Sequence, residues 1–387
     1  MSLTVTIQPR LISWAIKRSG LPVASVEKRF PVSAWQTGTK KPTLKQLESF
    51  AKLTMTPVGY LFLPKPPVEN LPVPDFRTFG DSSVKSPTPN LIDTLNETAR
   101  RQQWMREYVV ETGQGKLTFV GSLNLRTSPE KAAVAIRKEL GLRGDWAKEC
   151  KTWEESLKKL RESIEDIGVM VSVSGVVGMN NKRPLDPEEF RGFVFADSFA
   201  PLVFVNGADT KSAQMFTLAH ELAHIWIGKD AVFNLENLQP SKDETEIWCN
   251  AVAAEFLLPR GEFLEQSKGS DLNDLRSFYT IAKHFKVSPL VAARRSLDLK
   301  LIDKAKFFSF YAHTQRKWAE VKEARKANKG GNFYSTQTVR LGRRFSEAIV
   351  QASLEGRILY HDAYQLTGFR GETFERYANR LAKGRGK

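Results

Sequence analysis

Two histidines four residues apart, His220 and His224, enclose a glutamate in the run His-Glu-Leu-Ala-His. On an α-helix, residues at this spacing lie about 40° apart around the axis, so both imidazole rings can reach one metal ion. Glu221 lies beside them and can take a proton from a water molecule without binding the metal itself. The pattern therefore predicts a zinc site with a general base, which is the arrangement of metal-assisted hydrolysis.

Chance is a weak explanation of this pattern. The chain holds five histidines among 387 residues, and an accidental match would arise in roughly three such chains in a thousand. The alternative interpretation is a helix that presents two histidines and a charge to solvent without a metal. The other histidines, His284, His313 and His361, are candidates for stabilising an oxyanion by residue type alone.

A catalytic zinc needs a third protein ligand, with a fourth position left open for water. A second predicted helix runs from near Glu244 to Leu258 and stops at Pro259. Within it, Glu246 and Asn250 are four residues apart and share a face. We predict that Glu246 is the third ligand and that Asn250 orients a ligand through a hydrogen bond.

Other acidic residues near this helix are alternatives to Glu246. Asp243 and Glu244 lie close to the helix start, where negative charge is favourable even without a metal. Glu255 lies nine residues after Glu246, nearly on the opposite face, and is expected in solvent. Cys249 has no cysteine partner at metal-ligand spacing and is expected in the core.

The helix that carries the two histidines should be anchored in a hydrophobic core. Its other side is apolar and consists of Met215, Leu218, Leu222, Ile225 and Trp226. Asp209 is the predicted cap at its start. Gly228 is expected to end it, because glycine readily adopts the left-handed conformation found after a helix.

The region before this helix predicts a small sheet. Phe190–Ala196 and Leu202–Asn206 are expected to pair as neighbouring strands, and Gly168–Val177 is a β-branched run. Leu117–Gly121 is a further short strand candidate. Leu202–Asn206 is interpreted either as an edge strand that holds an extended substrate or as a core strand. With predicted helices between these strands, the fold class is mixed α+β.

The chain of 387 residues is too long to fold around one ordinary hydrophobic core. Its sequence predicts four regions. The regions are 1–75 with short helices, 76–119 with a linker and a connecting helix, 120–300 with the zinc motifs, and 301–387 with basic helices. Thr43 is the predicted cap of a helix in the first region. Prolines up to Pro74 mark the linker, and Asn328–Asn332 is a clear break.

The net charge of +15 is unevenly distributed. Residues 1–75 carry +6 and residues 301–387 carry +10, so the centre is nearly neutral. An acidic partner such as DNA or RNA would therefore contact the ends of the chain. The alternative is that lysine and arginine simply keep helical surfaces soluble.

The composition excludes several classes of protein. Hydrophobic residues make up 41% and charged residues 26%, which is the balance of a soluble globular protein. No apolar run approaches the roughly 18 residues of a membrane span. Residues 1–20 lack the features of a secretory signal, and two cysteines give no disulfide framework. A cytoplasmic location is therefore expected.

Two longer runs resemble signatures of the ImmA/IrrE family of metallo-endopeptidases, which are gluzincin-like proteases. Phe216–His224 is similar to the zinc helix of the family, and Glu246–Pro259 is similar to its second signature, in which the glutamate is the third ligand. Glu189–Gly192 and Pro201–Asn206 also fit family members, so the resemblance covers about residues 120–300. It implies a site-specific protease that acts on a cytoplasmic partner, often a helix-turn-helix repressor. It also implies a role in mobile elements, toxin-antitoxin-like modules or stress responses.

The N-terminal region resembles an XRE-type helix-turn-helix domain. Trp35–Gly38 and Pro42–Leu47 carry the resemblance, whereas Phe30-Pro31-Val32 would shorten or distort the recognition helix. Three lysines could still meet nucleic-acid phosphates: Lys40, Lys41 and Lys45. The alternative is a structural or partner-binding cap.

Two functions follow from these observations. The first is a zinc-dependent, site-specific endopeptidase that cleaves a cytoplasmic regulatory protein such as a repressor or an antitoxin. The second is a DNA-binding transcriptional regulator whose peptidase fold senses a signal and does not cut. Glu221 favours the first function, because a pure sensor has no need for a general base.

Overall fold

The computed structural model describes residues 4–69, 71–72, 87–233, 243–272, 274–324 and 333–384. For residues 315–324, 333 and 383–384 it describes the backbone alone. Pro74, the predicted break Asn328–Asn332 and much of the predicted linker lie outside these ranges. The chain divides into two compact units, which are Met1–Pro72 with Arg77–Asn96 (unit 1) and Val73–Phe76 with Glu97–Lys387 (unit 2).

Unit 1 contains short helices around its own hydrophobic core. They are α1 (Pro9–Ser19), α2 (Val23–Glu27), α3 (Val32–Gln36), α4 (Leu44–Leu53) and the 3-10 helix η1 (Val58–Phe62). Leu47 and Phe50 are fully buried, and Trp35 meets Phe50 edge-on with 5.8 Å between the ring centroids. Burial of these aromatic and aliphatic side chains stabilises unit 1.

The predicted cap in unit 1 is confirmed. Thr43 caps α4, because its side chain accepts a hydrogen bond from Gln46 N while Gln46 Oε1 accepts one from Thr43 N. α3 spans five residues and begins directly after Phe30-Pro31.

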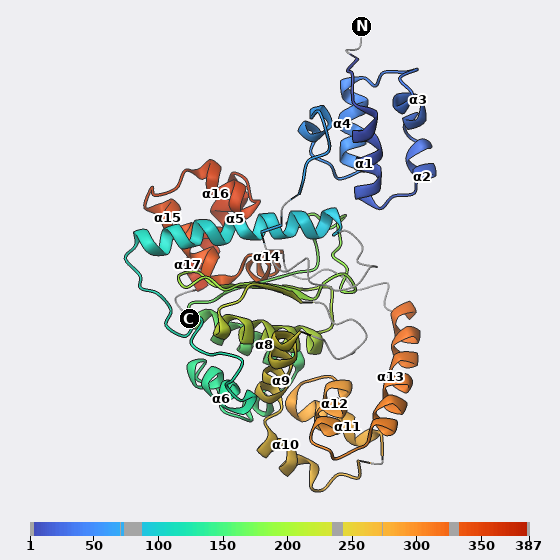
Figure 1. Cartoon of the computed structure of the whole chain (residues 1–387). Helices are drawn as coiled ribbons and strands as arrows, with labels where there is room; N and C mark the ends of the chain where they lie inside the picture. Colours follow the sequence, from blue (N-terminus) through green and yellow to red (C-terminus); the bar gives the residue numbers. More distant parts are fainter. Residues whose placement is uncertain are drawn as a thin grey trace. The chain divides into compact units, whose positions relative to one another are not determined.

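Unit 2 is built around a four-stranded sheet (Figure 1). The strands, in spatial order, are β1 (Met170–Ser174), β3 (Leu202–Asn206), β2 (Gly192–Phe195) and β4 (Ala231–Phe233). β1 is parallel to β3, and β2 is antiparallel to both β3 and β4. The pairing of β2 with β3 confirms the two predicted neighbouring strands.

Of the two interpretations of Leu202–Asn206, the core strand is confirmed and the edge strand is wrong. β3 lies between β1 and β2, and all five of its residues are buried. An uninterrupted apolar run is typical of a strand covered on both faces. Leu117–Gly121 was also predicted as a strand but is irregular, and Leu117 N donates a hydrogen bond to Ser198 O.

Helices cover both faces of the sheet. On one side lie α8 (Lys211–Ile227), α9 (Glu244–Leu257) and α6 (Pro129–Glu139) (Figure 1). α7 (Trp153–Asp166) packs against α8 and β1. Val203 of β3 shares a core with Leu222 of α8. Phe204 follows Val203 and lies on the other face, where its ring stacks on Phe193 with 4.7 Å between centroids.

The C-terminal helices belong to unit 2 and cover β1. They are α14 (Phe333–Leu341), α15 (Arg343–Leu354), α16 (Tyr360–Thr367) and α17 (Glu372–Gly384). Ser172 of β1 donates a hydrogen bond to Arg340 O. Glu165 accepts hydrogen bonds from the backbone N–H groups of Arg343 and Arg344 at the start of α15. Helices therefore cover one end of the sheet, and β4 forms its other end.

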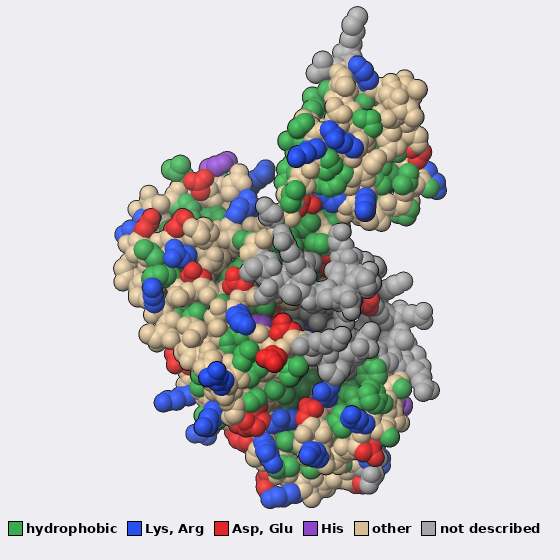
Figure 2. Space-filling view, viewed as in Figure 1, with side chains coloured by type: hydrophobic (Ala, Val, Ile, Leu, Met, Phe, Trp, Pro, Cys, Tyr) green, Lys and Arg blue, Asp and Glu red, His purple; other side chains and the backbone are tan. Residues whose placement is uncertain are grey.

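Further helices lie in the described ranges. They are α5 (Pro89–Glu111), η3 (Trp146–Glu149), α10 (Arg260–Ser267), α11 (Arg276–Phe285), α12 (Pro289–Asp298) and α13 (Lys304–Ala324). On the face seen in Figure 2, basic and acidic side chains are interspersed over the region of α10 to α12. In the described ranges, none of the helices has both the length and the apolar character of a membrane span.

Candidate metal centre

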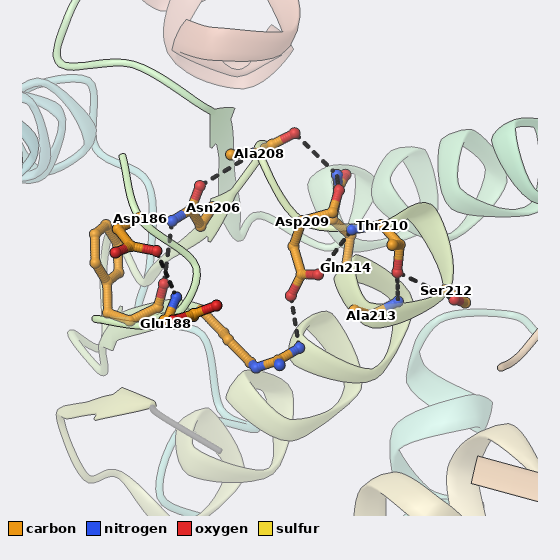
Figure 3. A network of polar contacts seen from close by, with 12 residues as sticks. Asp186, Glu188, Asn206, Ala208, Asp209, Thr210, Ser212, Ala213 and Gln214 are labelled. Atoms are coloured by element: carbon orange, nitrogen blue, oxygen red, sulfur yellow. Dashed lines mark hydrogen bonds and ion pairs between the residues drawn. The ribbon is translucent and has the colours of Figure 1, made fainter. Parts of the chain in front are cut away.

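The loop between β3 and α8 is fixed by buried and half-buried polar contacts (Figure 3). Asn206, the last residue of β3, donates from Nδ2 to Phe190 O at 3.1 Å and accepts at Oδ1 from Ala208 N at 3.1 Å. Gln214 in the first turn of α8 donates to Asp209 O at 2.7 Å. These contacts hold the start of α8 against the end of the central strand.

Thr210, rather than the predicted Asp209, caps α8. Its side chain accepts a hydrogen bond from Ala213 N at 3.3 Å. The carboxylate of Asp209 instead pairs at 2.7 Å with Arg191, which directly precedes β2. Burial raises the pKa of Asp209, and the charge of Arg191 opposes that shift. The ion pair therefore ties the start of α8 to the start of β2.

The other end of α8 closes at Gly228, as predicted. Gly228 has a φ of 69°, which is the left-handed conformation that glycine adopts without strain. The N–H of Gly121 donates to Ile225 O at 3.0 Å, and the ring of Phe119 stacks on Trp226 at 4.6 Å. The segment around residues 117–121 therefore supports the last turn of α8.

α9 runs from Glu244 to Leu257, close to the predicted bounds. Asp243 caps it by accepting a hydrogen bond from Thr245 N at 2.7 Å, and Glu244 is exposed. Trp248 Nε1 donates to Thr127 O at 2.7 Å, which anchors the helix to the segment before α6. The two acidic alternatives to Glu246 are thus a helix cap and a surface residue.

Glu255, predicted in solvent, is buried. Its carboxylate pairs with buried Arg295 and accepts a hydrogen bond from Arg260 N at 2.9 Å. Arg137 donates to Glu255 O at 2.8 Å. The charges at the end of α9 are therefore paired inside the protein, which lowers the cost of burying them.

His220, His224 and Glu246 come together between α8 and α9. His220 Nε2 lies 3.2 Å from Glu246 Oε2, and His224 Nε2 lies 3.2 Å from Glu246 Oε1. The two histidine Nε2 atoms are 3.1 Å apart. Both histidines are buried, whereas the Glu246 side chain is 27% exposed. Within the described ranges, these three side chains form a group that could hold one metal ion.

The three ligand atoms suit zinc in kind and in spacing. Zinc is bound by imidazole nitrogen and carboxylate oxygen, and donors about 2.0–2.2 Å from it in a tetrahedron lie about 3.4 Å apart. Asn250 Oδ1 lies 3.1 Å from His220 Nδ1. Because an amide oxygen can only accept, Nδ1 carries the proton and Nε2 keeps its lone pair for a metal.

The surroundings of these side chains also favour the protonation states that bind a metal. Burial lowers the pKa of His220, so its ring stays neutral. Burial disfavours the charged form of Glu246, but the contacts of its carboxylate with His220 and His224 outweigh burial and lower the pKa of Glu246. Neutral imidazoles and an ionised carboxylate are the forms that serve as ligands.

Glu221 is fully buried beside this group. In the part of the chain that the structure describes, neither of its carboxylate oxygens has a hydrogen-bond partner. Burial, followed by the negative charge of Glu246, raises the pKa of Glu221 well above its ordinary value. A buried carboxyl group without a partner costs stability, and such a cost is typical of a group retained for chemistry.

The other three histidines lie on different helices. His284 is in α11, and His313 and His361 are exposed on α13 and α16. None of them belongs to the group around His220 within the described ranges. Their suggested role in stabilising an oxyanion rested on residue type, and their positions give it no support.

We predict that Asn250→Ala weakens zinc binding by about 10–100-fold, because Nδ1–H of His220 loses its acceptor. Asn250→Asp keeps an acceptor oxygen and should bind zinc at least as tightly as the wild type. Competition with a chromogenic chelator measures both affinities. Equal zinc affinity of Asn250→Ala and the wild type would show that the hydrogen bond does not orient His220.

Two regions of the chain match known families. Residues 341–380, within the C-terminal helices, match a family described as a domain of unknown function (DUF8813). No curated protein matches the chain. Residues 165–297 match the model of a peptidase family, Peptidase_M78, described as the IrrE N-terminal-like domain. The region that contains His220, Glu221, His224 and Glu246 is therefore similar to a peptidase-family domain, in agreement with the ImmA/IrrE resemblance of its sequence.

Proposed function

We propose that the protein is a zinc-dependent endopeptidase. The observation that carries the proposal is the convergence of three ligand atoms beside Glu221, a buried carboxylate without a hydrogen-bond partner in the described ranges. The match of residues 165–297 to a peptidase family supports the same reaction class.

His220, His224 and Glu246 would hold the zinc. Zinc at this site would supply a Lewis acid that makes water more acidic and polarises a peptide carbonyl group. Glu221 takes the proton of the attacking water on its carboxylate and then returns a proton to the leaving amine. Its burial keeps bulk water away from the carboxylate during this transfer.

We propose an extended segment of a regulatory protein as the substrate. β4 forms the end of the sheet opposite to β1, and it pairs with β2 at Gly192 and Phe233. An extended peptide could add to β4 through backbone hydrogen bonds. The resemblance to the ImmA/IrrE family supports a cytoplasmic helix-turn-helix repressor or antitoxin as the protein that is cut.

Labelling of newly formed protein N-termini tests the proposal. An extract of the source organism is treated with the zinc-loaded protein or with the same protein after removal of zinc by a chelator. We expect a small set of new N-termini that needs zinc. If the zinc-loaded protein creates none beyond the zinc-free control, it is not a peptidase towards its own proteome.

A DNA contact by unit 1 is a second candidate function. It is favoured by three exposed lysines that follow α3 or lie in α4: Lys40, Lys41 and Lys45. Such contacts would bind phosphates without reading sequence, and binding would weaken steeply with salt. Gel-shift assays at increasing salt test this idea, and binding that does not change with salt would refute it.

A further inference from the structure

Gly192, the first residue of β2, lies at an unusual place for a glycine. It is buried and pairs with Val205 on one side and Phe233 on the other. Its backbone does not have a positive φ, so the conformational freedom of glycine is not the reason for its presence. Glycine inside a strand weakens it and is typical of a place that another group approaches closely.

The space beside Gly192 is filled by α8. A Cβ atom at this position would lie 2.5 Å from Thr217 Cγ2 and 3.1 Å from Glu221 Oε1. Its third neighbour would be Phe204 O on the adjacent strand, 2.8 Å away. Thr217 and Glu221 are four residues apart, so they lie on the same side of the helix. β2 therefore meets α8 at the residue that we assign as the general base.

The position of the Glu221 carboxylate depends on this packing. Both oxygens are buried, and no hydrogen bond holds them in the part of the chain that the structure describes. The packing of β2 against α8 at Gly192, rather than polar contacts, therefore limits where the Glu221 carboxylate can lie. The negative charge of Glu246 acts on the carboxylate as well, but as a repulsion.

We propose that Gly192 is a positioning residue for Glu221. Without a side chain at this position, β2 can pack on α8 and still leave room for the carboxylate beside the metal group. A methyl group at residue 192 would displace the carboxylate, or the turn of α8 that carries it. The effect on turnover rests on the proposed peptidase function, whereas the effect on the position of Glu221 does not.

Crystal structures of the zinc-loaded wild type and Gly192→Ala test the proposal directly. We expect the Glu221 carboxylate to move by about 1 Å while His220 and His224 stay in place, and kcat to fall by about 10²-fold at nearly constant KM. The zinc content per chain should not change. The matched control is Gly144→Ala, whose Cβ would meet the exposed carboxylate of Glu262, a side chain outside the metal group. Its kcat should stay within about threefold of the wild type.

The variant Gly192→Ala/Thr217→Ser removes the shortest of the three contacts. Its carboxylate should move less, and kcat should recover about tenfold relative to Gly192→Ala. If Gly192→Ala does not fold, the structure of this double variant tests the proposal instead. The Cβ atom at residue 192 still faces Glu221 in that variant. An unmoved carboxylate in either variant overturns the proposal. A displaced carboxylate in a protein whose wild type cuts nothing supports the role of Gly192 and refutes the peptidase function.

Discussion

Glu221→Gln is expected to abolish cleavage and to leave zinc binding intact. A positioned general base contributes about 10²–10⁴-fold to a rate, and glutamine cannot take the proton of the attacking water. Glutamine has nearly the shape of glutamate, so packing against Gly192 should be kept. The loss should appear in kcat, because the proton is transferred in the reaction step. The rate at which new N-termini form, measured per bound zinc, gives the comparison.

Glu244→Gln serves as the matched control for the loss of one carboxylate. Glu244 is exposed at the start of α9, so its replacement should change the rate by less than about threefold. Cleavage by Glu221→Gln at the wild-type rate would show that another group handles the proton. Equal losses of cleavage rate in Glu221→Gln and Glu244→Gln would show that removal of any negative charge in this region slows the reaction.

Glu246→Gln is expected to weaken zinc binding by about 10³-fold, which corresponds to about 4 kcal/mol. The amide has no negative charge and is a much poorer zinc ligand than a carboxylate. It also replaces the carboxylate oxygens that lie 3.2 Å from Nε2 of His220 and of His224. Competition with a chelator of known affinity measures the change, with Glu244→Gln as the control two residues away.

Zinc-dependent stability provides a second measurement on the same variants. Zinc raises the melting temperature only of a chain that binds it, by an amount that grows with its concentration. The wild type and Glu244→Gln should show this shift, and Glu246→Gln should show it only at far higher zinc. A shift in Glu246→Gln equal to that of the wild type would remove Glu246 from the ligand set.

The local parts of the site could be predicted from the sequence. Helical spacing alone places His220 beside His224, and Glu246 beside Asn250, because both pairs lie four residues apart. The bounds of these helices follow from capping chemistry at Gly228 and at the proline after α9. The structure brings the two pairs together, which spacing within either helix could not show.

The parts that could not be predicted depend on partners far apart in the chain. Glu255 has the sequence position of a surface residue, yet its partner Arg295 lies 40 residues further on. Asp209 has the sequence position of a helix cap, but its side chain pairs with Arg191, and Thr210 caps the helix. In both cases a distant ion pair outweighs the local preference.

The order of the strands could not be predicted for a related reason, and Leu202–Asn206 was left open between an edge strand and a core strand. Strand order is set by which residues meet across the sheet, and β1 pairs with β3 from a distant part of the chain. The signal that β3 is central was present, since Leu202–Val205 is uninterrupted in its apolar character. Gly192 was predicted within a strand but not as a site residue, because its meaning depends on the helix packed against it.

Metal content per chain is the most direct test of the central claim. Mass spectrometry of the purified wild type, after zinc is supplied and the excess removed, should find about one zinc per chain. The variant His220→Ala/His224→Ala should retain none. A wild type that stays free of metal, or a double variant that retains it, would contradict the assignment of His220, His224 and Glu246 as a zinc site.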